Sequence, residues 1–199
     1  MKQTIIILFG CLMSFTNVLG QGIRFSSAHN SWEDIVREAS LEKKLIFVDT
    51  YTTWCSPCKK MDADIFPLKE VGDFFNQHFI SVKIDAWNGM GVDFAKVNDV
   101  NEYPTYLFFS PDGKPVMRGK GAISAKDLIA LGKEAIKNYQ NGVSVEQIED
   151  MMNKTDLSPD DFQKVLNYVR ILRLPMVGYI ERYLDRLPED SLYNNTTFV

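Results

Sequence analysis

The chain has 199 residues, of which 45% are hydrophobic, and a formal net charge of -4 from 22 basic and 26 acidic residues. This length and composition suit one packed domain of common size with an appendage. The sequence contains no cluster of Lys and Arg interleaved with aromatic residues, so neither nucleic acid nor an anionic membrane surface is an expected partner.

The N-terminus has the pattern of a targeting segment. Lys2 precedes an apolar run over residues 5–13, and small and polar residues then follow up to Gly20. This order predicts a signal peptide over residues 1–20, cleaved after Gly20, and therefore an exported protein. The apolar run is well below the roughly 20 residues that span a bilayer. Lipoprotein anchoring through Cys11 is not expected, because the apolar run before it is short.

Strand and helix signals alternate through the next part of the chain. Apolar and alternating segments predict strands over residues 45–48, 79–85, 105–109 and 115–118, the last two joined by a turn at 111–114. Capping residues and helical periodicity predict helices over residues 32–39, 59–66, 71–75, 92–97 and 125–139. This order is typical of an α/β fold, in which helices cover both faces of a mixed sheet.

Two cysteines follow the apolar strand in the segment Trp54-Cys55-Ser56-Pro57-Cys58. If the chain enters a helix at Cys55, the two thiols lie close enough to share a disulfide. The unpaired N–H groups and positive dipole end of the helix would stabilise a thiolate and lower the pKa of Cys55 below about 8.5. Cys55 is therefore the expected attacking sulfur, and Cys58 is the expected resolving thiol.

A zinc site is the alternative use of these cysteines. Cleavage of the signal peptide would leave Cys55 and Cys58 as the only cysteines, so zinc would need two further ligands at matching spacing. His29 and His78 are isolated from each other and from the pair. Redox chemistry without a metal or an organic cofactor is the expected use.

From about Ser31 to Tyr139 the chain resembles the thioredoxin family. The resemblance is carried by markers in the family's order: Asp49, Trp54-Cys55-Ser56-Pro57-Cys58-Lys59, Pro104-Thr105, Asp112-Gly113 and Lys120-Gly121-Ala122. It implies the thioredoxin fold. In its export signal and its departures from the family pattern, the chain is more similar to exported bacterial thioredoxin-like proteins and to the C-terminal periplasmic domain of the disulfide reductase DsbD than to a cytosolic thioredoxin. This similarity implies a periplasmic location and a DsbD-like membrane electron donor.

The resemblance also implies roles for residues outside the cysteine pair. Asp49 matches the family's buried acid, whose pKa burial would raise and which would carry the proton of Cys58. Pro104 matches a cis proline facing the disulfide, an arrangement that would let the backbone of Tyr103 pair with an extended substrate segment. The alternatives are a solvated acid at a strand end and an ordinary turn proline.

Three further residues are expected around the cysteines. Trp54 would form, with Tyr103, an apolar rim for docking client chains around an exposed Cys55 sulfur, although it could also serve as core. Ser56 and Pro57 would tune the redox equilibrium, because proline removes a backbone donor near the sulfurs and fixes one backbone angle.

The chain departs from the family pattern at two places. The lysine that many thioredoxins place near the buried acid aligns with Ser81 rather than with Lys83, and this weakens the expected proton relay through Asp49. The segment from Asp85 to Pro104 is longer than in a minimal thioredoxin. It is either a substrate-facing loop or a tolerated surface insertion, and the insertion is the preferred interpretation.

The resemblance ends near Tyr139. Residues 21–140 are the expected thioredoxin-like domain, and residues 141–199 form a predicted all-helical extension. Ser144, Ser158 and Pro175 mark the starts of its helices. The extension would pack on itself or on the core, or it would serve as a docking or dimerisation module.

These features together predict an exported thiol-disulfide oxidoreductase that reduces or isomerises protein disulfides through Cys55 and Cys58. The Ser56-Pro57 pair resembles the Gly-Pro pair of reducing family members more than the dipeptides of strong oxidants. The alternative is a binding module of the same fold that holds a client or membrane partner and whose thiols are incidental.

Overall fold

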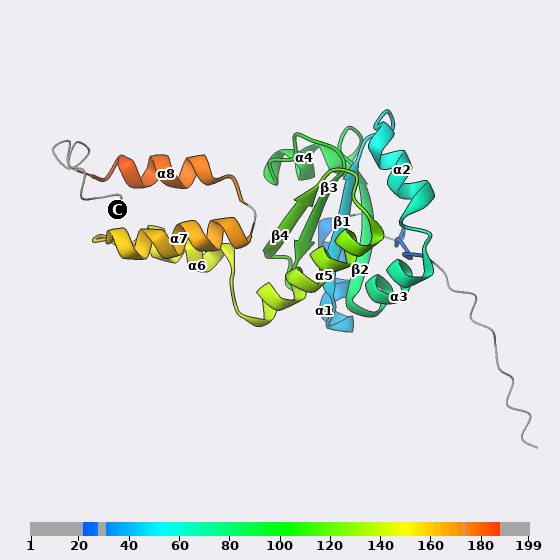
Figure 1. Cartoon of the computed structure of the whole chain (residues 1–199), viewed down its shortest axis with the longest axis horizontal. Helices are drawn as coiled ribbons and strands as arrows, with labels where there is room; N and C mark the ends of the chain where they lie inside the picture. The colour runs from blue at the N-terminus through cyan, green and yellow to red at the C-terminus, as the bar shows by residue number, and fades with distance from the viewer. Residues whose placement is uncertain (1–21, 28–30, 173, 188–199) are drawn as a thin grey trace, which may run out of the picture.

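A computed structural model describes residues 22–27, 31–172 and 174–187, and Figure 1 shows the whole chain. Four strands form one sheet in the order β2-β1-β3-β4, in which β1 is parallel to β2 and antiparallel to β3, and β3 is antiparallel to β4. The strands are β1 Leu45–Tyr51, β2 Phe79–Asp85, β3 Thr105–Phe109 and β4 Pro115–Lys120. The expected signal peptide over residues 1–20 lies outside the described residues.

Helices cover both faces of the sheet (Figure 1). Side chains of α1 and α4 join the core on one face, and those of α2, α3 and α5 join the core on the other. The helices are α1 Trp32–Glu42, α2 Ser56–Asp64, α3 Lys69–His78, α4 Met90–Val97, α5 Ala125–Gln140, α6 Val145–Met152, α7 Pro159–Ile171 and α8 Met176–Leu184. The predicted α/β fold with a mixed sheet and a helical extension is therefore confirmed.

Strand β1 lies in the middle of the domain and is buried on both faces. Phe47 belongs to the core beneath α2, α3 and α5, while Ile46 and Val48 belong to the core beneath α1 and α4. Because successive side chains of a strand point to opposite faces, Asp49 lies on the same face as Phe47. The carboxylate is thus directed toward the layer that contains α2.

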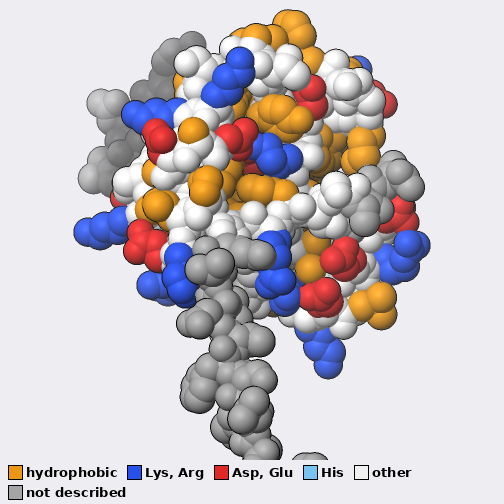
Figure 2. All heavy atoms as spheres, turned by 90° about the vertical axis from the view of Figure 1, so that its right-hand side faces the viewer, with side chains coloured by type: hydrophobic (Ala, Val, Ile, Leu, Met, Phe, Trp, Pro, Cys, Tyr) orange, Lys and Arg blue, Asp and Glu red, His pale blue; other side chains and the backbone are white. Residues whose placement is uncertain are grey.

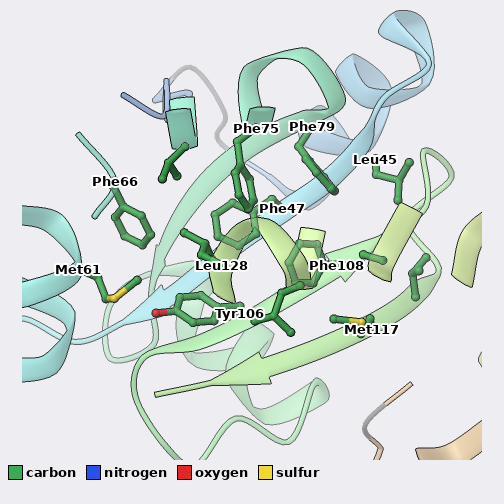
Figure 3. Close-up of a cluster of buried hydrophobic side chains, with 14 residues drawn as sticks. Leu45, Phe47, Met61, Phe66, Phe75, Phe79, Tyr106, Phe108, Met117 and Leu128 are labelled. Carbon is green, nitrogen blue, oxygen red and sulfur yellow. The ribbon is translucent and has the colours of Figure 1, made fainter. Parts of the chain in front are cut away.

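An aromatic core holds α2 on the sheet (Figure 3). The Phe47 ring centroid lies 4.7 Å from that of Phe75 in α3 and 5.3 Å from that of Phe108 in β3. Met61 of α2 belongs to the same cluster and is only 1% exposed. Since Met61 follows Cys58 by about one helical turn, its burial keeps the cysteine end of α2 against the sheet.

The C-terminal helices form a third hydrophobic cluster, which lies beside the sheet in Figure 1. The rings of Phe162 and Tyr183 stack with centroids 3.8 Å apart, and Arg182 donates two hydrogen bonds, of 3.0 and 2.9 Å, to Glu149. α6, α7 and α8 therefore pack on one another, which agrees with the expectation that the extension packs on itself. The domain boundary after residue 140 stays a prediction.

Local helix signals match the structure closely. The hydroxyl oxygens of Ser31, Ser124, Ser144 and Ser158 each accept a hydrogen bond from a backbone N–H three residues later. In the part of the chain that the structure describes, no helix combines the length and hydropathy needed to cross a bilayer.

Candidate redox site

The two cysteines lie at the N-terminus of α2 and are joined by a disulfide, with their Cα atoms 5.3 Å apart. Cys55 is the N-cap residue, and its Sγ accepts a hydrogen bond of 3.1 Å from the backbone N–H of Cys58. Ser56 and Pro57 fill the first two helical positions, where the missing N–H of Pro57 costs no intrahelical bond. The helix terminus therefore directs a backbone donor and a positive dipole end at Cys55 Sγ.

Both cysteines are almost completely covered in this disulfide state. Cys55 is 3% exposed and Cys58 is 2% exposed. The expectation of an exposed Cys55 sulfur is therefore wrong for the oxidised protein. The Cys55 sulfur caps the helix and bonds to Cys58.

Asp49 is a buried acid on the sheet face that α2 covers. It pairs with Lys83 across the β1–β2 ladder and with Tyr106 across the β1–β3 ladder, so the three residues form a row across the sheet. Burial raises the pKa of Asp49 from 3.8 to about 6, although the charge of Lys83 opposes the rise. An acid of this kind can exchange a proton near neutral pH.

Lys83 links the buried acid to the helix that carries the cysteines. Its Nζ lies 3.0 Å from Asp49 Oδ2 and also contacts a carboxylate oxygen of Asp62 in α2. Burial lowers the pKa of Lys83, but the charges and hydrogen bonds of the two carboxylates outweigh it, and the pKa is raised overall. The prediction that Ser81 takes the place of this lysine is wrong. Ser81 pairs with Phe47, two residues before Asp49.

Replacing Asp62 with asparagine is expected to lower the pKa of Asp49. The substitution removes a negative charge that raises this pKa, and it leaves Lys83 with Asp49 as its charged partner at the site. A carboxyl NMR titration of Asp49 in the oxidised protein measures the change. Asp64→Asn, at the exposed end of the same helix, is the matched control. An unchanged pKa in Asp62→Asn would show that the Asp62 charge does not reach Asp49.

Trp54, which directly precedes Cys55, contacts two other aromatic side chains. The ring of Trp54 lies 5.9 Å from that of Tyr103 and 5.2 Å from that of Trp87, and both pairs are edge to face. Trp54 is 56% exposed and Trp87 is 67% exposed. We call these three side chains the aromatic rim. Because Trp87 belongs to it, the long segment after β2 contributes a side chain to the aromatic rim. The interpretation of this segment as a tolerated surface insertion stays a prediction.

The expected cis peptide bond is present between Tyr103 and Pro104. The carbonyl of Pro104 accepts a hydrogen bond of 2.8 Å from the N–H of Gly121, and the carbonyl of Gly121 accepts one of 3.0 Å from the Tyr106 hydroxyl. Burial raises the pKa of Tyr106 far above its ordinary value, so its hydroxyl stays protonated and donates. These bonds fix the segment that carries Tyr103.

A family model for the thioredoxin-like domain matches residues 32–136, which is just over half of the chain. This chain belongs to the thioredoxin-like family. Its cysteine pair, buried acid and cis proline lie within the matched residues, and the helical extension lies beyond them.

Individual relatives agree with this assignment. The thioredoxin-like protein is 38% identical to a candidate disulphide-isomerase from Bacteroides thetaiotaomicron, whose solution structure superposes with a TM-score of 0.53 over 59% of this chain and 95% of that one. It is 34% identical to thioredoxin-1 of Saccharomyces cerevisiae over 49% of this chain and 87% of that protein. It is also 32% identical to chloroplastic thioredoxin Y1 of Arabidopsis thaliana, over 54% of this chain and 58% of the relative. The chain thus spans less than two thirds of that plant relative.

The described part of this thioredoxin-like protein contains no group of three or more His, Cys, Asp or Glu side chains placed to hold a metal ion. Sequence reasoning missed Trp87 and Asp62 as neighbours of the site. The place of Trp87 could have been predicted, because loops that follow adjacent parallel strands meet at the same edge of a sheet. For Asp62 the sequence offered weaker evidence, namely its position about one helical turn after Cys58.

Proposed function

We propose that this thioredoxin-like protein is exported to the periplasm, where it reduces or isomerises disulfides in client proteins. The observation that carries the proposal is the Cys55–Cys58 disulfide at the N-terminus of α2, with Cys55 Sγ accepting the N–H of Cys58. A dithiol at this place can accept and return two electrons as a bond between two sulfurs.

The reduced enzyme begins with the Cys55 thiolate, which attacks one sulfur of a client disulfide. The other client sulfur leaves as a thiolate, and a mixed disulfide joins Cys55 to the client. Asp49 then takes the proton of the Cys58 thiol, and the Cys58 sulfur attacks Cys55 Sγ. The second client thiolate leaves. Asp49 passes the proton of Cys58 to one client thiolate, and the other client thiolate takes from water the equivalent of the proton that Cys55 lost on ionising. The client gains two electrons, and the enzyme ends as the disulfide. For further turnovers, we propose that a DsbD-like membrane donor returns two electrons.

Replacing Cys58 with alanine is expected to trap the mixed disulfide, because the resolving sulfur is then absent. The reduced variant would be mixed with a protein containing scrambled disulfides, and adducts would be separated on a non-reducing gel and assigned by mass spectrometry. The matched control is the variant with both cysteines replaced by alanine, which should form none. Partners that stay bound equally to wild type, variant and control after reduction would instead support a binding module with incidental thiols.

A further inference from the structure

Hydrophobic side chains are exposed between charged ones on the side of the domain that carries α2 and α3 (Figure 2). The aromatic rim is the exposed apolar cluster that adjoins the disulfide in sequence, since Trp54 directly precedes Cys55. Exposed clusters of large apolar side chains commonly mark interaction surfaces, and Trp and Tyr contribute strongly to binding free energy at such surfaces.

The segment that carries Trp87 is held by its own hydrogen bonds. The N–H of Ala86 donates to the carbonyl of Tyr51 at 2.9 Å, which ties the segment to the end of β1. The N–H of Trp87 itself donates to Asp85 Oδ1 at 3.0 Å. Hydrogen bonds to the last residue of β1 and the last residue of β2 therefore hold the backbone at Ala86 and Trp87.

Close packing at the start of α4 supports the same conclusion. A Cβ atom on Gly91 would lie 1.9 Å from the carbonyl oxygen of Asp85, so this glycine lets α4 begin directly against the end of β2. The N–H of Gly91 donates to the carbonyl of Asn88 at 3.0 Å and closes the turn. Trp87 is thus presented on an ordered turn while its indole stays mostly exposed.

We propose that Trp87 selects the clients of the proposed reaction, and that it favours extended segments carrying an aromatic or large aliphatic residue within about three residues of the reactive cysteine. The proposal rests on the proposed function. When the client sulfur bonds to Cys55, the neighbouring client residues must lie against the side chains that adjoin Cys55. Extended chains rise about 3.3 Å per residue, so a side chain two residues from the client cysteine lies about 7 Å along the chain from that cysteine. Trp54 directly precedes Cys55, and the ring of Trp87 lies 5.2 Å from that of Trp54, so the two rings offer a continuous apolar surface to such a side chain.

The test compares two peptide disulfides that differ only two residues from the cysteine, where one carries leucine and the other serine. Wild-type protein should have a kcat/KM for the leucine peptide about tenfold above that for the serine peptide, a ratio equivalent to 1.4 kcal/mol. In Trp87→Ala this ratio should fall to near one, and the change should appear in KM more than in kcat, because a binding contact is lost. Trp87→Phe should keep most of the preference.

Two controls separate this proposal from the proposed function. Leu41→Ala removes a side chain that is 79% exposed on α1, and it should leave the ratio unchanged. Wild-type reduction of a small organic disulfide without a peptide chain reports the redox chemistry alone. If that reduction proceeds while wild type and Trp87→Ala show the same ratio, Trp87 does not select clients. If wild type reduces neither the small disulfide nor the peptides, the proposed function itself is wrong.

Discussion

Replacing Cys55 with serine is expected to lower disulfide reductase activity by at least about 10³-fold, within the roughly 10⁶-fold loss that removal of a nucleophile can cause. The serine hydroxyl can still cap α2, but it is not ionised near neutral pH and cannot form a disulfide. The fold should therefore persist while the first covalent step is lost. Turnover of a protein disulfide at pH 7 measures the effect.

Cys58→Ser is the matched comparison for this prediction. It leaves the attacking sulfur at the helix N-terminus and removes only the resolving one. We expect a single turnover that stops at the mixed disulfide, whereas Cys55→Ser forms no adduct. Equal formation of mixed disulfide in the two variants would contradict the assignment of Cys55 as the nucleophile.

Replacing Asp49 with asparagine is expected to stabilise the oxidised protein at pH 8 by up to about 3 kcal/mol, the equivalent of raising a pKa from 3.8 to about 6. The folded state binds the proton of Asp49 more tightly than the unfolded chain does. The stability that this group contributes is therefore fully present below pH 3.8 and is lost as the pH rises through about 6. Asparagine keeps the shape of the side chain and carries no charge to bury.

Urea unfolding at pH 4 and pH 8 measures this difference. The variant should be more stable than wild type at pH 8, and the gap should nearly close at pH 4. Asp64→Asn, which changes an exposed acid of α2, should show no such gap. A variant less stable than wild type at pH 8 would show that the Asp49–Lys83 ion pair outweighs the cost of burying the charge.

The same substitution should slow the resolving step. Asp49 can accept the proton of Cys58 only when it is ionised, so the wild-type rate of this step should rise with pH through about 6. In Asp49→Asn that rise should disappear, and resolution at pH 7 should be about 10²-fold slower, at the low end of the effect of a general base. Release of client thiol from a preformed mixed disulfide measures this step alone.

Local sequence signals predicted much of the fold. The strands over residues 79–85 and 105–109 have the predicted limits, because turn and helix residues bound both segments sharply. The caps at Ser144 and Ser158 were also predicted, since a cap depends on residues only three positions apart. α3 was predicted as residues 71–75 and spans Lys69–His78, because its tertiary packing extends a weak local pattern.

The errors concern contacts between segments that are distant in sequence. Ser81 and Lys83 are two residues apart and lie on the same face of β2. Only the register of the β1–β2 ladder therefore decides which of them lies beside Asp49. The contact between the rings of Trp87 and Trp54 was not predicted either, because it depends on the edge where β1 and β2 end together. The residue types predicted the redox chemistry of the site. Which side chains contact Asp49 and Trp54 depends instead on strand register and sheet topology.

The equilibrium between the Cys55–Cys58 dithiol and its disulfide, titrated against glutathione mixtures and followed by thiol alkylation, tests the redox assignment most directly. We expect one reversible two-electron transition with a midpoint nearer to the roughly -270 mV of thioredoxin than to the roughly -120 mV of the oxidant DsbA. A midpoint near that of DsbA would reverse the proposed direction of electron flow. A pair that does not cycle across the titration would contradict the redox function itself.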